Sequence, residues 1–280
     1  MQEAEMAACR SFIRKAVLAA GMVLAVSATP ALAQSCGNDG AGFDRWLASY
    51  KQSMSQQGIS NRTLQTALGN VSYNREVIRL DRNQRSFKLS LDEFMQRRAP
   101  ASFVKRGQGI IRENARLLNA IEKQYGVPKE ILVAIWGMET GFGSNSGNMN
   151  IFRSLATLAY DCRRSEFFTN ELNAALMIVE RGDKRPEDMK GAWAGEIGQT
   201  QFLASNYLRY AVDFDGDGRR DLIRSRADVL ASTANFLRQH GWQPGAGYMP
   251  GEPNFARLRD WNRAGVYQQA LALFASRLAN

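Results

Sequence analysis

The stretch Pro128-Lys-Glu-Ile-Leu-Val-Ala-Ile-Trp-Gly-Met-Glu139-Thr-Gly-Phe-Gly143 is the most informative part of this 280-residue chain. Proline suits the first turn of a helix, because it lacks the backbone N–H that has no intrahelical partner there. Apolar side chains then recur at three- and four-residue spacing, which predicts a buried helix face. The glycine-rich run 141–147 ends the pattern. We therefore expect an apolar helix whose last turn carries Glu139.

The surroundings of Glu139 favour a protonated carboxyl group. Trp136, Met138 and Phe142 flank it in the sequence and would desolvate it, and the negative end of a helix disfavours a second negative charge. Both effects raise the pKa of a carboxyl group. Cleavage of a glycosidic bond requires such an acid, because the leaving oxygen must receive a proton. The alternative is an ordinary surface glutamate beside an apolar stripe.

Helical periodicity continues through most of the chain, whereas runs with the period-2 pattern of strands are scarce. The residues 71–91 are less regular. The sequence therefore predicts a mainly α protein in which N-terminal helices pack against one catalytic unit. We expect its other helices at 43–57, 61–68 (with Asn61 as N-cap), 101–125, 165–180, 203–212, 227–240 and 265–278.

The N-terminus has the pattern of an export signal. Arg10, Arg14 and Lys15 precede an apolar run at 16–26, and Ala31-Leu-Ala33 supplies a cleavage motif. The sequence predicts cleavage after Ala33 and a periplasmic or otherwise exported protein. A membrane anchor is the competing interpretation, but the apolar run is shorter than the ~20 residues that a bilayer requires. We expect no transmembrane segment in the mature chain.

Charge and cysteine usage suit an exported protein. The formal net charge of +9 favours an anionic partner such as a cell-wall polymer, and the basic clusters are too short to predict nucleic-acid binding. Signal removal leaves Cys36 and Cys162, which we expect to form a disulfide; two free thiols are the alternative.

Several kinds of catalytic site are excluded by the sequence. With one histidine, a multi-histidine zinc site is excluded. Neither a G-x-S-x-G elbow nor a phosphate loop occurs. After these exclusions, the chemistry that the sequence still allows is catalysis by carboxyl groups, for which no cofactor is required.

Six motifs in a fixed order carry a family resemblance. They are Glu139-Thr-Gly-Phe-Gly, Tyr160-Asp-Cys-Arg-Arg-Ser-Glu-Phe-Phe168, Gly191-Ala-Trp-Ala-Gly-Glu-Ile-Gly-Gln-Thr-Gln-Phe202, Val212-Asp-Phe-Asp-Gly-Asp-Gly218, His240-Gly-Trp242, and Trp261-Asn262 before Tyr267. From Phe43 onward the chain resembles the lytic murein transglycosylases of the membrane-bound lytic transglycosylase B type. The resemblance implies a lysozyme-like fold, with a signal peptide at 1–33, an N-terminal helical extension packed on the core at 34–99 and a lysozyme-like transglycosylase domain at 100–280.

The resemblance also implies a reaction. Glu139 would act as the sole acid and base on the β-1,4 bond between N-acetylmuramic acid (MurNAc) and N-acetylglucosamine (GlcNAc) of peptidoglycan. It would protonate the leaving oxygen and then deprotonate the muramoyl C6 hydroxyl, which closes a 1,6-anhydro ring without water. The motif around Glu139 holds no second carboxylate, whereas ordinary glycosidases use two. Asp161 stays open as a second acid.

Substrate-binding residues follow from the same resemblance. Gln201 would hydrogen-bond the substrate near the reacting centre, and Arg163 and Arg164 would hold peptide or lactyl carboxylates, which a guanidinium fork binds well. A solvated surface pair is the alternative for the two arginines. The positions that would line the glycan cleft, with helix packing as the alternative, are Trp261, Asn262 and Tyr267.

Two positions depart from the family pattern. Ala192 stands where the family usually has Ser, and Glu196 stands where a small residue is common. We therefore keep two rivals to the transglycosylase. One is a lysozyme-type hydrolase, and the other is a weakly active or non-catalytic peptidoglycan-binding protein. We expect a monomer in each case.

The acidic stretch 213–224 has the spacing of an EF-hand calcium loop. Asp213, Asp215 and Asp217 occupy positions 1, 3 and 5, and Gly218 at position 6 allows the sharp turn. The backbone carbonyl of Arg219 would be the ligand at position 7. Arg224 replaces the bidentate Glu of position 12, so Asp228 would have to close the site. The sequence predicts a structural Ca²⁺ here; a metal-free Asp-Gly turn is the alternative.

Overall fold

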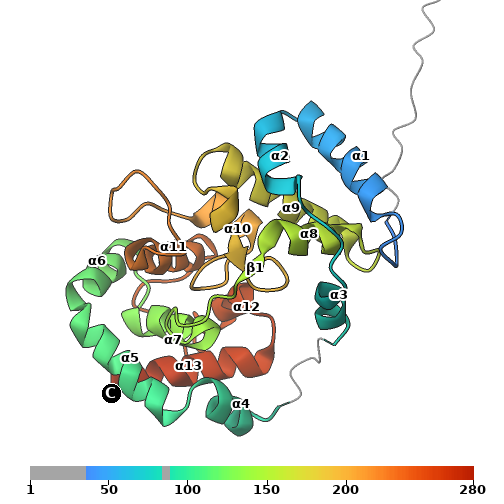
Figure 1. The fold of residues 1–280 in the computed structure, drawn as a ribbon. Helices are drawn as coiled ribbons and strands as arrows, with labels where there is room; N and C mark the ends of the chain where they lie inside the picture. Colours follow the sequence, from blue (N-terminus) through green and yellow to red (C-terminus); the bar gives the residue numbers. More distant parts are fainter. Residues whose placement is uncertain (1–35, 84–88) are drawn as a thin grey trace, which may run out of the picture. The chain divides into compact units, whose positions relative to one another are not determined.

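A computed structural model describes residues 36–83 and 89–280 of the chain. Helices dominate the described residues (Figure 1). Two strands of two residues each form an antiparallel sheet, in which Met149 pairs with Gly191 and Asn150 with Lys190. The elements are α1 (Phe43–Gln56), α2 (Asn61–Leu68), α3 (Arg75–Arg82), α4 (Leu91–Arg98), α5 (Ala101–Glu113), α6 (Ala115–Tyr125), α7 (Lys129–Thr140), β1 (Met149–Asn150), α8 (Ile151–Tyr160), α9 (Ser165–Glu180), η1 (Pro186–Asp188), β2 (Lys190–Gly191), α10 (Ala204–Tyr210), α11 (Arg226–Gln239), η2 (Phe255–Arg257), α12 (Leu258–Trp261) and α13 (Gly265–Ala279).

The prediction of a mainly α fold is confirmed, and α9 has the predicted bounds. One predicted helix is wrong in its continuity: the segment 101–125 forms α5 and α6, separated at Asn114. The side-chain amide of Asn114 donates to the carbonyl of Ile110 at 2.8 Å and accepts from Arg226 at 2.7 Å. A short polar side chain that bonds to the preceding turn competes with helix propagation, which explains the break.

The N-cap of α2 is also one residue earlier than predicted. The Ser60 hydroxyl, not the side chain of Asn61, accepts the N–H of Thr63 at 3.2 Å, and Asn61 is the first helical residue. Serine and asparagine are both strong N-cap residues. The sequence therefore locates the start of this helix only to within one residue.

Helix α7 lies in the centre of the packing. Nine of its residues are buried, including every position from Ile131 to Met138. Helix α13 packs against α7, α5 and α4, while α11 packs against α6 and α7. Because helices surround α7, the acid at its C-terminal end is held by elements from distant parts of the sequence.

The N-terminal helices attach to the α8–α9 pair. Helix α1 contacts α8, and the ring of Phe43 meets Tyr160 edge-on at 5.6 Å between centroids. The predicted disulfide between Cys36 and Cys162 is present, and the N–H of Gly37 donates to the carbonyl of Tyr160 at 2.9 Å. The start of the described chain is thereby fixed beside the loop that follows α8.

From Cys36 on, the described residues form one unit, and the proposed division between 34–99 and 100–280 stays a prediction. The expected signal peptide lies outside the described residues. Within them, we find no helix with both the length and the apolar composition needed to cross a bilayer.

Candidate active site

Glu139 lies in the last turn of α7 and receives two hydrogen bonds on one carboxylate oxygen. The Tyr267 hydroxyl donates to Oε1 at 2.5 Å, and the Trp261 indole N–H donates to the same atom at 3.2 Å. The donors come from α13 and α12, which the sequence places more than 120 residues away. The structure thus brings Glu139, Trp261 and Tyr267 together.

Burial raises the pKa of Glu139 above its ordinary value. The hydrogen bonds from Tyr267 and Trp261, and the charge of Arg98, act in the opposite direction, because they favour the carboxylate. Desolvation has the larger effect. The pKa of Tyr267 is raised well above 10 by burial and by the negative charge of Glu139, so this phenol keeps its proton and remains a donor. Burial therefore favours the protonated form of Glu139, which can donate its proton, while the hydrogen bonds from Tyr267 and Trp261 stabilise the carboxylate that remains after the proton is lost.

A network around Gln199 fixes the end of α7. The Thr140 hydroxyl donates to the Gln199 carbonyl at 2.5 Å, and the Trp136 indole donates to the Gln199 side chain at 3.0 Å. The Gln199 amide in turn donates to the carbonyl of Ile223 at 2.8 Å. A Cβ on Gly143 would lie 2.3 Å from the Gln199 side chain, and the φ of this glycine is +79°. Gln199 was not among the predicted site residues, although it lies in the quoted motif.

Glu139 lines two cavities. The larger is about 570 Å³ and is lined by Glu139, Phe167, Glu196, Thr200, Gln201, Phe202, Leu203, Asn206, Phe236, Asp260, Trp261, Asn262 and Arg263. The smaller is about 330 Å³ and is lined by Arg97, Arg98, Phe103, Arg106, Gly137, Met138, Glu139, Thr140, Gly141, Ser144 and Asn145. Glu139 is the one residue that the two linings share.

Three predicted substrate residues line the larger cavity: Gln201, Trp261 and Asn262. Gln201 has a φ of +56°, which is uncommon for a residue with a side chain. Its amide donates to the carbonyls of Gly198 at 2.9 Å and Ser146 at 3.2 Å. Tyr267 is buried and contacts Glu139 rather than appearing in the lining.

Arg163 and Arg164 lie elsewhere. Both bind Asp81 at the end of α3: the Nε of Arg163 lies 2.7 Å from Oδ2, and the guanidinium of Arg164 lies 2.5 Å from Oδ1. Neither arginine lines the two cavities that contain Glu139. Their contact with substrate carboxylates stays a prediction.

Asp161, the other acid left open by the sequence, is buried and paired. Its carboxylate lies 2.7 Å from Arg82 and accepts the N–H of Arg163 at 3.0 Å. It lines neither cavity beside Glu139. It is therefore part of the N-terminal ion-pair network and not of this site.

Glu196 is the acid that shares the larger cavity with Glu139. Its Oε2 is buried and has no hydrogen-bond partner among the described residues. Burial raises the pKa of Glu196, the charge of Glu139 raises it further, and Arg164 acts in the opposite direction. Its carbonyl accepts the N–H of Ala192 at 3.1 Å. The two positions that depart from the family pattern thus belong to one turn.

The acidic loop places three carboxylates together. Oxygens of Asp213, Asp215 and Asp217 all lie within 4.8 Å of one another, and such hard oxygen donors suit Ca²⁺. Backbone N–H groups of Gly216 and Gly218 donate to Asp213, both at 2.8 Å. The loop therefore already has the turn that gathers its carboxylates.

Asp228 and Asp221 are used differently. The buried carboxylate of Asp228 accepts the N–H groups of Phe214 at 2.8 Å and Asp221 at 2.7 Å, which joins the two ends of the loop. Asp221 forms an ion pair with Lys184. Asp228 is not one of the three clustered acids, so its predicted role as the closing ligand has no support here; for the Arg219 carbonyl the role stays a prediction.

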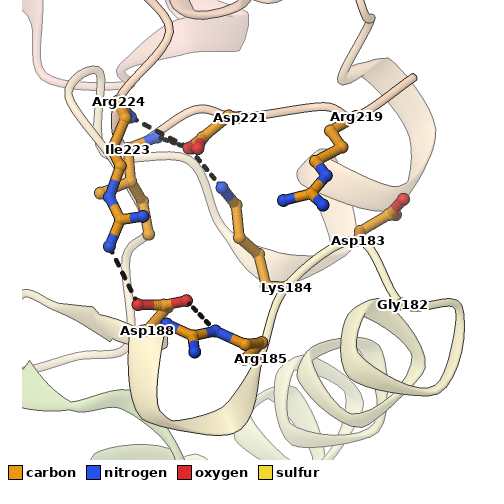
Figure 2. Close-up of a pocket in the computed structure, with 9 residues that line it drawn as sticks. All are labelled: Gly182, Asp183, Lys184, Arg185, Asp188, Arg219, Asp221, Ile223 and Arg224. Atoms are coloured by element: carbon orange, nitrogen blue, oxygen red, sulfur yellow. Dashed lines mark hydrogen bonds and ion pairs between the residues drawn. The ribbon is translucent and has the colours of Figure 1, made fainter. Parts of the chain in front are cut away.

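A further cavity of about 440 Å³ lies beside this loop and is lined by Gly182, Asp183, Lys184, Arg185, Asp188, Arg219, Asp221, Ile223 and Arg224 (Figure 2). Its charges largely compensate one another. Asp188 binds Arg185 at 2.8 Å and Arg224 at 3.0 Å, and Lys184 is paired with Asp221 (Figure 2). Glu139 is not part of its lining, so we assign the chemistry to the two cavities described above.

Comparison with known proteins identifies the family of the chain. Residues 42–251 match the family model of the transglycosylase SLT domain. The membrane-bound lytic murein transglycosylase B of Escherichia coli K12 is 41% identical over 145 residues, which are 49% of this chain. The aligned region spans only 40% of that relative's length.

Solved structures resemble a larger share of the chain. SltB3 from Pseudomonas aeruginosa, solved in complex with NAG-NAM-pentapeptide, matches with a TM-score of 0.81 and 31% identity. The match covers 86% of this chain and 80% of the SltB3 chain. The same protein was solved with NAG-anhNAM-pentapeptide, at 32% identity. The Escherichia coli lytic transglycosylase Slt35, in complex with calcium, has a TM-score of 0.76 and 26% identity, and covers 88% and 96%. With its matching family model and its lysozyme-like helical fold, the chain belongs to the transglycosylase SLT domain family.

Proposed function

We propose that this protein is a lytic transglycosylase that cleaves the β-1,4 bond between MurNAc and GlcNAc of peptidoglycan and leaves 1,6-anhydro-MurNAc ends. The observation that carries the proposal is Glu139 itself, an acid with a raised pKa that lines two cavities. The P. aeruginosa relative with NAG-NAM-pentapeptide and NAG-anhNAM-pentapeptide ligands supports the same substrate and product.

The first step needs the neutral form of Glu139. Its proton passes to the glycosidic oxygen as the bond from that oxygen to C1 of MurNAc breaks. The carboxylate that remains is stabilised by the donors Tyr267 and Trp261, since hydrogen bonds to an ionised group are the strong ones.

The second step returns the proton. The Glu139 carboxylate accepts the proton of the C6 hydroxyl while O6 forms a bond to C1, so the anhydro ring closes and the acid is regenerated. Water is not consumed. One residue with two stable protonation states is sufficient for both steps, which matches the balance of burial and hydrogen bonding around Glu139.

A lysozyme-type hydrolase is the second candidate, because Glu196 lines the same cavity and a second carboxylate is what water activation requires. Mass spectrometry of digested, purified peptidoglycan separates the two reactions. A transglycosylase releases fragments one water lighter than those of a hydrolase. Exclusive release of the heavier fragments would refute the transglycosylase, and binding without any release would favour the non-catalytic alternative.

The acidic loop is proposed to hold a structural Ca²⁺ through Asp213, Asp215 and Asp217. The clustered oxygens support this, as does the related Slt35 that was solved with calcium. Arg224 at the last loop position supplies no carboxylate, so affinity should be low compared with EF-hands that carry the bidentate Glu. Calcium would act on the loop and not in the reaction, for which no cofactor is required.

Export is part of the same proposal. Peptidoglycan lies outside the cytoplasm, and the disulfide between Cys36 and Cys162 suits an oxidising compartment. Cleavage after Ala33 and a monomeric state remain predictions. N-terminal sequencing of the secreted protein would test the cleavage site, and size-exclusion chromatography would test the monomeric state.

A further inference from the structure

Three arginines line the smaller cavity beside Glu139: Arg97 and Arg98 from α4 and Arg106 from α5. None of the three forms an ion pair within residues 36–83 and 89–280, and Glu139 is the single acidic residue of this lining. The cavity of Figure 2 has four basic side chains and three acidic ones, whereas this cavity has three basic side chains and Glu139 as its acid. Its excess of positive charge is therefore larger.

The elements that carry these arginines are held in place. Helix α4 begins with a capping box between Ser90 and Glu93, and it packs against α13, where Phe94 meets Tyr267 at 6.3 Å between ring centroids. The guanidinium of Arg106 lies 5.0 Å from the ring centroid of Phe142 and donates to Ser144 at 3.1 Å. The positive cavity is therefore anchored to the same residues that shape the active site.

The other candidates for binding an anion are less suitable. Arg163 and Arg164 are occupied by Asp81. The larger cavity has Arg263 as its one cation, beside the carboxyl groups of Glu139, Glu196 and Asp260. The two cavities that Glu139 lines thus differ in charge, and an acidic group of the substrate is favoured in the smaller one.

We propose that the smaller cavity is a carboxylate subsite, in which Arg97, Arg98 and Arg106 bind the acidic groups carried by a peptide-bearing muramoyl residue. The inference rests on the proposed function for the identity of the polymer. Every second sugar of that polymer bears a lactyl peptide, so a carboxylate enters the cleft at a regular distance from each scissile bond. A guanidinium group binds a carboxylate through paired N–H donors, which gives both charge and direction.

The test measures binding to three ligands that differ in acidic groups. They are a MurNAc-GlcNAc oligomer with stem peptides, the same glycan after an amidase has hydrolysed the amide to each peptide and freed the lactyl carboxylate, and a GlcNAc oligomer without carboxylates. The protein carries Glu139→Gln, so that no ligand is cleaved. Into this background we introduce Arg97→Gln, Arg98→Gln and Arg106→Gln, singly and together. Arg112→Gln on α5 is the matched control, because Arg112 is exposed and outside the cavity lining.

We expect the peptide-bearing glycan to bind about threefold more weakly for each arginine lost and about thirtyfold more weakly in the triple variant, as for exposed ion pairs. Binding of the GlcNAc oligomer should change less than twofold. Added salt should weaken the binding of the peptide-bearing glycan to the parental cavity but hardly affect the triple variant. If the peptide-bearing glycan alone loses affinity, the stem peptide supplies the bound carboxylate. If the amidase-treated glycan loses affinity as well, the lactyl carboxylate that the amidase frees also occupies the subsite.

Equal losses for all three ligands, or no loss for the peptide-bearing glycan, would overturn the subsite. The GlcNAc oligomer also reports on folding, and Arg→Lys variants should recover part of the affinity because they keep the charge. A failure of the proposed function looks different: the enzyme with an intact Glu139 would release no anhydro products, whatever the arginine variants do.

Discussion

Replacement of Tyr267 by Phe tests how the site controls the proton of Glu139. The change removes one hydroxyl group and keeps the ring that packs near Phe94. Among residues 36–83 and 89–280, it leaves Glu139 with the indole N–H of Trp261 as its remaining side-chain donor. Because the Tyr267 hydrogen bond lowers the pKa of Glu139, its loss must raise that pKa.

The size of the effect follows from the geometry. An O–H donor at 2.5 Å from Oε1 forms a charge-assisted bond with the ionised acid, and such bonds contribute roughly 1.5–3 kcal/mol. One pKa unit corresponds to about 1.4 kcal/mol, so the pKa of Glu139 should rise by about 1–2 units. The acid form starts the reaction, and activity is lost as the pH rises through this pKa. The alkaline limb of the profile should therefore move to higher pH by about 1–2 units.

The assay is kcat/KM for a soluble peptidoglycan fragment measured across pH, with the anhydro product quantified by chromatography. At neutral pH we expect kcat to fall about threefold to tenfold, because a weaker acid protonates the leaving oxygen less effectively. Tyr248→Phe is the control, since Tyr248 is half-buried and outside both cavities beside Glu139. An alkaline limb that stays in place, or moves to lower pH, would refute the assigned role of the Tyr267 hydroxyl.

Four further outcomes are expected. Glu139→Gln should abolish product release, and activity equal to that of the parental protein would disprove the assignment of Glu139 as the catalytic acid. The same change should raise Tm at alkaline pH, because a buried acid whose pKa is raised by folding destabilises the fold once the pH exceeds the pKa of that acid in the unfolded chain. Ala192→Ser should raise turnover in the same assay, and unchanged turnover would show that the missing hydroxyl is compensated. Cys162→Ser should lower Tm by up to about 10 °C, because the disulfide to Cys36 stabilises the fold by ~4–5 kcal/mol in the chain-entropy model. Titration of two reactive thiols in the unreduced, denatured parental protein would exclude the bridge. Calcium should raise Tm of the parental protein but not of Asp215→Asn, with magnesium as the control.

The sequence predicts those parts of the fold that alternate between buried and exposed positions. Helix α9 is an example, with buried residues at helical spacing from Phe168 to Ile178. Helix α8 was not predicted, because all of its residues except Arg153 are buried and no polar face marks its period. Helix α4 was missed for the opposite reason, since Phe94 and Met95 are its only buried residues.

The acid and its immediate surroundings are predictable because their chemistry is local. Trp136 and Phe142 are close to Glu139 in the chain, and both are buried in the structure. Partners of charged residues are not local. The side chain that occupies Arg163 and Arg164 is Asp81, some 80 residues earlier, in a segment where the sequence predicts no regular element. Ion-pair choice depends on which helices pack together, so a basic motif alone could not show whether its arginines are free.

The second acid of the cleft bears on which reaction is favoured. A hydrolase of the two-carboxylate type needs one acid protonated while the other is ionised to activate water or stabilise the sugar. Glu196 is raised in pKa by burial and again by Glu139, and it lacks the pair of aromatic donors that supports the Glu139 carboxylate. Two like charges in one cavity also oppose each other. Negative charge is therefore better accommodated on Glu139 than on Glu196, which leaves the cleft with one acid that can exchange a proton in both directions, as ring closure by the substrate's own hydroxyl requires.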